Sequence, residues 1–183
     1  MIEDKARWNE KHVTKPIKYE VSPTLEKYIK HANVGAALDL ACGTGRNTHF
    51  LEKLDFLVDA VDLSDYALSQ IRDTKNIVKI ETDLDIYDLK KNSYDLILNC
   101  NYLNRRLMEQ MIDSLKEGGL LIFETFIITD EKLEQGSMNP AYLLTKNELL
   151  NTFINLDVIY YEERSEVNLR GERNKIASLV AKK

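Results

Sequence analysis

The sequence predicts an α/β fold: a seven-stranded, mostly parallel sheet with helices on both faces and a C-terminal antiparallel hairpin. Three observations support this class. Short apolar runs alternate with amphipathic helical patterns through about residue 126, which is typical of parallel strands joined by helices. A glycine-rich turn follows the first apolar run. Two further strand patterns, over about 156–162 and 174–181, favour a closing hairpin.

The first half of the chain supplies three of these strands. The apolar run from Ala36 to Ala41 is bounded by glycines and predicts a buried parallel strand. Before it, Ser22-Pro23 predicts a helix start, with the serine as N-cap. A short helix within residues 5–11 is a further candidate. The other elements expected here are a helix over about 47–53, a strand over 57–63, a helix capped by Ser64 and an alternating edge strand over 77–81.

The second half continues the alternation. A strand is expected over 94–100, a helix with an apolar stripe over 103–115, and a strand over 120–126 after Gly118-Gly119. Residues 127–144 are irregular, and so long a loop is often functional. Thr145 and Glu148 form a capping-box pattern for a helix over 146–153. Arg170-Gly171 is expected near the tip of the final hairpin.

Size and composition fit one domain over residues 1–183. The chain has 44% hydrophobic and 30% charged residues and no apolar run of membrane-spanning length. Its N-terminus does not resemble a signal peptide, and two cysteines make no disulfide framework, so we expect a cytoplasmic protein. A net charge of −5 makes nucleic acid an unlikely unaided partner. No HExxH or CxxC pattern supports a metal site.

The residues around the glycine turn indicate an adenosine ligand. Asp62 ends the second strand pattern nineteen residues after Gly43, where an acid can accept hydrogen bonds from ribose hydroxyls. Thr48 occupies the place of the third glycine of a dinucleotide motif, which disfavours a pyrophosphate. Asp39 lies four residues before Gly43, and its carboxylate suits a cationic ammonium group.

As an ordered set, these motifs resemble class I S-adenosylmethionine (SAM) methyltransferases. The likeness covers about residues 34–126, and Gly43-Thr44-Gly45-Arg46-Asn47 is similar to the tellurite-resistance and thiopurine methyltransferase group. It implies a Rossmann-like sheet in the order 3-2-1-4-5-7-6, a cofactor-binding core at 34–126, an N-terminal cap at 1–22 and an acceptor-side region at 127–183. The motifs are Asp39-x-Ala41-x-Gly43-x-Gly45, Asp62-Leu63-Ser64, Thr82-Asp83-Leu84, Tyr94-Asp95-Leu96-Ile97 and Leu115-Lys116-Glu117-Gly118-Gly119.

The resemblance implies a role for each cofactor residue. Asp39 would serve the methionine ammonium group, Asp62 the ribose, Asp83 and Leu84 the adenine, and Asn99 the floor of the site. Aspartates at strand ends also cap helices and turns, which is the structural alternative. The full set of expected cofactor residues is Trp8, Asp39, Ala41, Gly43, Gly45, Arg46, Asn47, Asp62, Leu63, Asp83, Leu84 and Asn99.

On the acceptor side, His12, Tyr102 and Arg105 are the candidates for catalytic contacts. His12 has the chemistry of a general base near neutral pH, but an ordinary surface histidine is the more common case. Arg105 could hold an anionic acceptor, whereas we interpret Arg106 as solvated helix surface. Trp8 either folds over the cofactor or anchors the N-terminal segment on the domain.

These observations predict SAM-dependent methyl transfer to a small acceptor by in-line displacement, with a soft sulfur, selenium or tellurium nucleophile as one class. Two alternatives stay open. One is an RNA or protein methyltransferase that works with a partner. The other is a SAM-binding protein without turnover. The sequence does not distinguish oligomeric states.

Overall fold

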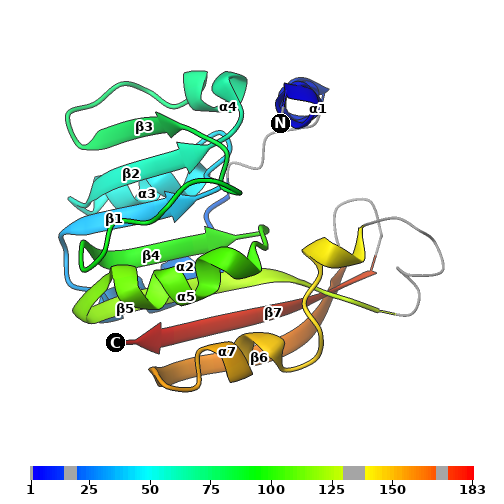
Figure 1. The fold of residues 1–183 in the computed structure, drawn as a ribbon. Helices are drawn as coiled ribbons and strands as arrows, with labels where there is room; N and C mark the ends of the chain where they lie inside the picture. The colour runs from blue at the N-terminus through cyan, green and yellow to red at the C-terminus, as the bar shows by residue number, and fades with distance from the viewer. Residues whose placement is uncertain (1, 15–19, 130–138, 168–172) are drawn as a thin grey trace.

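The computed structural model describes residues 2–14, 20–129, 139–167 and 173–183. They form one seven-stranded sheet in the order β3-β2-β1-β4-β5-β7-β6, with helices on both sides (Figure 1). Both the sheet and its order confirm the expected fold class. The strands are β1 (Ala36–Leu40), β2 (Leu57–Asp62), β3 (Ile77–Glu81), β4 (Tyr94–Cys100), β5 (Leu115–Ile127), β6 (Asp157–Val167) and β7 (Arg173–Lys182).

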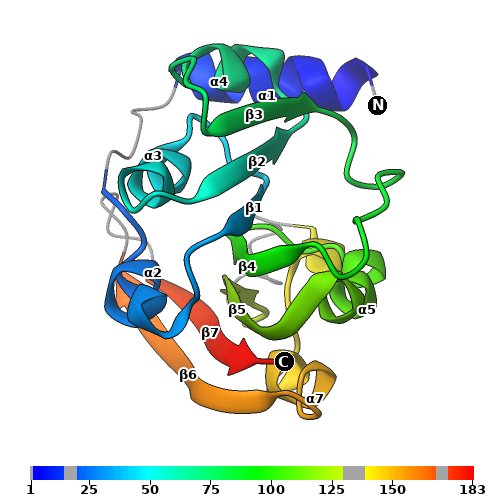
Figure 2. The same cartoon turned by 90° about the vertical axis from the view of Figure 1, so that its left-hand side faces the viewer.

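Helices and short 3-10 turns connect and cover these strands. Figure 2 shows α2 and α3 on one side of the sheet and α5 and α7 on the other. The helices are α1 (Ile2–Thr14), α2 (Pro23–Tyr28), α3 (Arg46–Lys53), α4 (Asp65–Ser69), α5 (Arg105–Ser114) and α7 (Glu148–Thr152), with 3-10 turns η1 (Ile29–His31) and η2 (Pro140–Tyr142).

Strands β1 to β5 pair in parallel, so their carboxyl ends meet at one edge of the sheet. Strand β7 runs antiparallel between β5 and β6, which is the expected closing hairpin. β3 lies at an outer edge, as its alternating pattern predicts. This arrangement places the loops after β1, β2, β3 and β4 side by side, where a ligand of a parallel α/β sheet binds.

Two apolar clusters hold the helices on the two faces. Leu103, Leu107 and Met111 of the α5 segment pack with Phe153 and the α5 side of the sheet. Leu25 of α2, Leu51 of α3 and Leu68 of α4 pack against the opposite face. Burial of such side chains contributes about 1.5–3 kcal/mol each, so these clusters fix the framework of the site. The methionines of α5 are core residues, as their spacing predicts.

Several expected boundaries were wrong. β5 begins at Leu115, not 120, because Leu115 already pairs with Tyr94 of β4. The register then shifts, and regular pairing resumes at Leu96 and Leu120. Gly118 has a φ of 74° within the shifted stretch, so the two glycines serve a bulge inside the strand. β6 and β7 extend to Val167 and from Arg173 because they pair with each other over that length.

Helix boundaries also differ. α1 spans Ile2–Thr14, longer than the expected 5–11, whereas α5 begins at Arg105 after its N-cap Asn104. α7 begins at Glu148 because Asn147 has a left-handed φ of 59°. The Thr145 amide still donates to Glu148 Oε2 at 2.8 Å, as in a capping box. The hairpin tip at Arg170-Gly171 and much of the irregular loop lie outside the described residues.

A buried ion pair joins the strands of the C-terminal half to α2. Glu124 of β5 accepts hydrogen bonds from Thr24 Oγ1 at 2.7 Å, Ser178 Oγ at 2.5 Å and Arg164 Nη2 at 2.8 Å. Burial opposes ionisation, but these three donors outweigh it and lower the pKa of Glu124. The Thr24 hydrogen bond therefore ties α2 to β5, Ser178 ties β7 to β5, and the ion pair with Arg164 ties β6 to β5.

Both cysteines, Cys42 and Cys100, are free thiols. None of the helices in the described ranges has the length and apolarity needed to cross a membrane.

Candidate active site

The glycine turn after β1 lies at the carboxyl edge of the sheet, between the ends of β2 and β4. Ala41, Gly43 and Gly45 have φ values of 52°, 54° and 81°. Left-handed φ is routine for glycine but unusual for alanine, so three left-handed residues within five positions make a tightly specified loop. Such conformations concentrate at ligand sites.

Each glycine also lies against a neighbour. A Cβ on Gly45 would approach Ile71 Cγ1 to 2.6 Å, and one on Gly43 would lie 3.3 Å from His12 Cε1. Gly45 is the N-cap of α3, so any side chain there would disturb both the turn and the helix start. The loop therefore requires glycine at Gly45 for shape and packing.

Asp39 lies in β1, where it is 2% exposed. Its Oδ2 accepts a hydrogen bond from Thr48 Oγ1 on α3, at 2.7 Å. Burial raises the pKa of Asp39 to about 7, with the Thr48 hydrogen bond and the Arg46 charge opposing that shift. A buried carboxyl that accepts from a neutral residue is expected to gain from a cationic partner.

Asp62 ends β2 and supports the glycine turn directly. Its Oδ2 accepts from the Gly43 amide at 2.8 Å, and its Oδ1 accepts from the Ser64 amide at 2.8 Å. Each carboxylate oxygen can accept a second hydrogen bond. Asp62 thus shapes the loop, and its carboxylate oxygens can still accept hydrogen bonds from the hydroxyl groups of a ligand. Leu63, the next residue, is half-buried.

Helix α1 lies beside α4 and close to the glycine turn (Figures 1 and 2). Lys5 Nζ is 2.9 Å from Asp65 Oδ2 and 2.5 Å from Glu81 Oε1. Asn9 donates to Asp65 Oδ1 at 2.7 Å and accepts from Ser64 Oγ at 2.6 Å. These polar contacts bring the N-terminal segment to the carboxyl edge.

His12 and Trp8 share one face of α1. Their ring centroids are 6.2 Å apart, and Lys11 Nζ lies 3.8 Å from the Trp8 ring centroid. Burial lowers the pKa of His12, with the Asp62 charge acting against it and Lys11 with it. His12 is therefore a mostly neutral imidazole at pH 7, next to Gly43.

Asp83 and Leu84 begin the loop after β3. Asp83 Oδ1 accepts from the Asp85 amide at 2.9 Å, and the Asp83 carbonyl accepts from the Ile86 and Tyr87 amides. The Leu84 side chain is only 5% exposed and belongs to the core on the α5 face. The loop is thus a compact turn that presents Asp83 at the sheet edge.

Asn99, near the end of β4, is fully buried and donates from Nδ2 to the Tyr102 carbonyl at 2.7 Å. Within the described residues its Oδ1 has no hydrogen-bond partner, which is uncommon for a buried polar atom. Tyr102 is half-buried, and burial raises the pKa of its phenol to about 12. Tyr102 is therefore a phenol at neutral pH.

Three other expected site residues bind neighbouring backbone or side chains. Asn47 Oδ1 accepts from the Ser22 amide at 3.0 Å, which ties α3 to the start of α2. Arg46 Nη1 donates to the Glu20 carbonyl at 2.9 Å. Arg105 donates to Glu148 Oε1 at 2.6 Å and also to the carbonyls of Ala141 and Leu143.

Sequence reasoning missed the supporting residues. Thr48 was read as a missing glycine, yet its hydroxyl contacts Asp39. Ser64 was expected only as a helix cap, and it does cap Ala67, but it also joins Asp62 to Asn9. Arg106 is exposed on α5, as its interpretation as helix surface expects, but its guanidinium also contacts the loop after β3, which the sequence did not predict.

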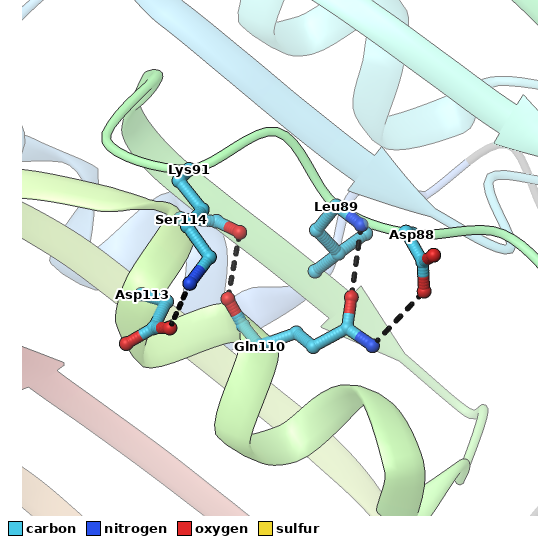
Figure 3. Close-up of a pocket in the computed structure, with 6 residues that line it drawn as sticks. All are labelled: Asp88, Leu89, Lys91, Gln110, Asp113 and Ser114. Atoms are coloured by element: carbon cyan, nitrogen blue, oxygen red, sulfur yellow. Dashed lines mark hydrogen bonds and ion pairs between the residues drawn. The ribbon is translucent and has the colours of Figure 1, made fainter.

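Figure 3 shows a surface pocket of about 310 Å³ between the loop before β4 and the C-terminal half of α5. Residues 88–91 precede β4, so this pocket lies toward the amino edge of the sheet, away from the glycine turn. Gln110 crosses it, accepting from the Leu89 amide at 2.9 Å. Across the described ranges, no cluster of three or more His, Cys, Asp or Glu side chains has a metal-binding arrangement.

Comparison with solved structures gives the same fold. TehB from Haemophilus influenzae has a TM-score of 0.75 at 21% identity, covering 98% of this chain and 66% of that one. Geranyl diphosphate C-methyltransferase from Streptomyces coelicolor A3(2), solved with Mg²⁺, geranyl diphosphate and S-adenosyl-L-homocysteine, has a TM-score of 0.68 at 13% identity, covering 86% and 78%.

Sequence comparison is more specific. The probable S-adenosyl-L-methionine-dependent methyltransferase TehB of Haemophilus influenzae strain Rd is 24% identical over 163 residues, which are 80% of this chain and 56% of that protein. The chain thus spans little more than half of this relative. The family model for the tellurite resistance protein TehB matches residues 1–176. The chain therefore belongs to the TehB tellurite resistance protein family.

Proposed function

We propose that this protein transfers the methyl group of SAM to a small-molecule acceptor. The observation that carries the proposal is the arrangement of Asp39, the Gly43–Gly45 turn and Asp62 at one sheet edge, in a chain of the TehB family. The relatives are named as probable SAM-dependent methyltransferases, and a structural neighbour carries the demethylated cofactor product.

Two buried polar groups support the fit of this cofactor. The buried Asp39 carboxyl accepts hydrogen bonds from Thr48, a neutral residue, and within the described residues Asn99 Oδ1 has no hydrogen-bond partner. Both groups gain from a ligand with ammonium or other N–H donors. The left-handed loop from Ala41 to Gly45 lets a ligand approach the backbone closely.

When bound, SAM supplies a methyl group that its sulfonium already activates for in-line displacement. The task of the protein is therefore placement, which can supply about 7–11 kcal/mol of a reaction barrier. Asp39 would hold the ammonium end, Asp62 the ribose hydroxyls and Asp83 the adenine. Leu63 would line the ribose, and Asn99 would form the floor.

His12 and Tyr102 are our proposed acceptor-side contacts. A neutral His12 beside Gly43 has the protonation state of a base, while Tyr102 stays a neutral phenol at pH 7 and can donate a hydrogen bond. The contacts of Arg105 with Glu148 and two carbonyls favour a role in holding the 140–148 segment. Those of Asn47 and Arg46 favour a role in holding α2 and the segment before it.

Thermal shift tests the cofactor. SAM and S-adenosylhomocysteine should raise the Tm, because a ligand that binds only the folded state stabilises it by mass action. NAD should not, since Thr48 replaces the third glycine of a dinucleotide motif. A Tm raised by NAD and unchanged by SAM would contradict the proposal.

An acceptor panel tests the reaction. Labelled SAM is incubated with thiol, selenium and tellurium nucleophiles, with total RNA, and with protein. Transfer to a small nucleophile supports the proposal, and transfer only to RNA or protein supports a macromolecular methyltransferase. Cofactor binding without any transfer supports a SAM-binding protein.

A further inference from the structure

Side chains of three residues at or in α5, namely Asn104, Arg106 and Gln110, hold the loop after β3. Asn104 Nδ2 donates to the Leu84 carbonyl at 3.2 Å and to Asp85 Oδ1 at 2.9 Å. Arg106 Nη2 donates to the Leu84 carbonyl at 3.0 Å and to the Tyr87 carbonyl. Two side chains from one helix end therefore converge on the Leu84 carbonyl.

The same helix also holds the far end of this loop, through Arg106 and Gln110. Arg106 Nη1 lies 2.7 Å from Asp88 Oδ1, and Gln110 binds both Asp88 and the Leu89 amide. Figure 3 shows Gln110 reaching across to residues 88 and 89. The loop thus has a near attachment at Leu84 and a far attachment at Asp88 and Leu89.

The near attachment at Leu84 restrains Asp83, the residue proposed to bind the adenine. Leu84 is anchored twice, by its buried side chain in the core and by its carbonyl on Asn104 and Arg106. The carboxylate of Asp83, directly before it, accepts a hydrogen bond from the Asp85 amide. With Leu84 anchored, the Asp83 carboxylate has little freedom to turn away from the sheet edge.

We propose that Asn104 and Arg106 are positioning residues for the adenine end of the cofactor, acting through the Leu84 carbonyl on the orientation of Asp83. The inference rests on the proposed function. It makes the start of α5 part of the apparatus that selects the base, although neither side chain touches the ligand. Since Asn104 Nδ2 also lies 3.3 Å from the Tyr102 hydroxyl, the same residue joins the adenine loop to the segment after β4.

The test uses variants that keep the fold. Asn104→Ser retains the N-cap of α5, because serine is as good a cap as asparagine, but its shorter side chain loses the reach to Leu84. Arg106→Lys keeps a charge near Asp88, but its single ammonium nitrogen cannot replace the guanidinium, whose two terminal nitrogens reach Asp88 and the Leu84 carbonyl separately. Calorimetry measures the Kd of each full-length variant for S-adenosylhomocysteine and for its deaminated inosine analogue.

The expected result is specific to the base. Each variant should weaken S-adenosylhomocysteine binding about five- to twentyfold and should lower discrimination against the inosine analogue about threefold or more. Gln110→Ala is the matched control: it removes the Gln110 bonds to Asp88 and Leu89 and leaves Leu84 held by Asn104 and Arg106, so it should lower the Tm and leave base discrimination unchanged.

The outcomes separate this inference from the proposed function. Tight cofactor binding by the unmodified chain with unchanged discrimination in Asn104→Ser and Arg106→Lys overturns the inference alone. Equal loss of discrimination in Gln110→Ala overturns it too, because any loosening of the loop would then suffice. An unmodified chain that binds neither ligand overturns the proposed function and, with it, this inference.

Discussion

At the scale of single residues, the buried carboxyl group of Asp39 has a strongly raised pKa. Burial raises the pKa of its carboxyl group to about 7, whereas an aspartate in the unfolded chain ionises near pH 4. Between those values the folded protein holds a proton that the unfolded chain has lost. The free energy of unfolding therefore falls as the pH rises through this window.

Asp39→Asn should consequently stabilise the protein at pH 8 while weakening the cofactor site. The amide keeps an acceptor for Thr48 and carries no charge to desolvate, so we expect a gain on the order of 1–3 kcal/mol in unfolding free energy. Urea denaturation at pH 4 and pH 8 measures it. The gain should shrink at pH 4, where both proteins are neutral at this position; an equal gain at both pH values would contradict the electrostatic cause.

Cofactor affinity should depend on pH for the same reason. An ammonium group beside Asp39 favours the ionised carboxylate, so binding below pH 7 requires proton release and weakens by up to about tenfold per pH unit. Calorimetry between pH 5.5 and 7.5 measures the slope while an α-amino group stays protonated. The slope should vanish in Asp39→Asn. A slope that persists there would identify another titrating group, with His12 nearest the loop.

At the scale of elements, α1 attaches to the domain through polar contacts with α4 and β3. Exposed ion pairs contribute about 0–1 kcal/mol each, so removing residues 1–12 should change the Tm by only a few degrees. Turnover should fall about tenfold or more, because His12 and Trp8 would be lost from above the loop. Cofactor Kd should change less. Calorimetry and turnover assays on the truncated and full-length proteins test this prediction. Unchanged turnover in the truncated protein would mean that α1 is only a surface anchor.

The buried Glu124–Arg164 pair predicts a second effect at this scale. Arg164→Leu should lower the unfolding free energy by about 2–4 kcal/mol, because Glu124 would remain buried without its cation. A Glu124→Gln/Arg164→Leu double variant should recover part of that loss, since a neutral amide can still accept from Thr24 and Ser178. Urea denaturation of the single and double variants measures the coupling. Additive losses would mean that the two side chains act independently.

At the scale of the whole molecule, the charge balance bears on the acceptor. The chain carries 30 acidic and 25 basic residues, and binding a polyanion requires several cations and weakens steeply with salt. For a small acceptor, we expect KM to change only about threefold between roughly 50 and 300 mM salt. Initial rates across that range give the measurement. A log–log slope of several units would instead favour an RNA substrate.

The sequence predicted the sheet and the principal candidate residues because both depend on local pattern. Apolar runs and glycine spacing suffice to place Asp39, Gly43 and Asp62 at the ends of neighbouring parallel strands. The contacts that support the site were harder to predict from the sequence. Contacts such as Ser64–Asn9 and Arg106–Leu84 join positions 55 and 22 residues apart, and they depend on side-chain directions that periodicity does not encode.

Boundary errors had a related cause. Asn147 interrupts an otherwise favourable helix pattern by adopting a left-handed φ, and its amide donates to Glu163 on β6 at 2.6 Å. That bond depends on tertiary packing. The extension of β5 to Leu115 likewise depends on pairing with Tyr94 across a bulge, which the local sequence around Gly118 predicts only as a turn.

The position of β7 between β5 and β6 has a consequence for biosynthesis. β7 follows all the other strands in the chain, yet it is interior and bonds to neighbours on both sides. While a ribosome still encloses residues 173–182, β5 and β6 each lack a partner along an open edge, and such edges invite pairing with other chains. The nascent protein is therefore vulnerable to aggregation until β7 emerges.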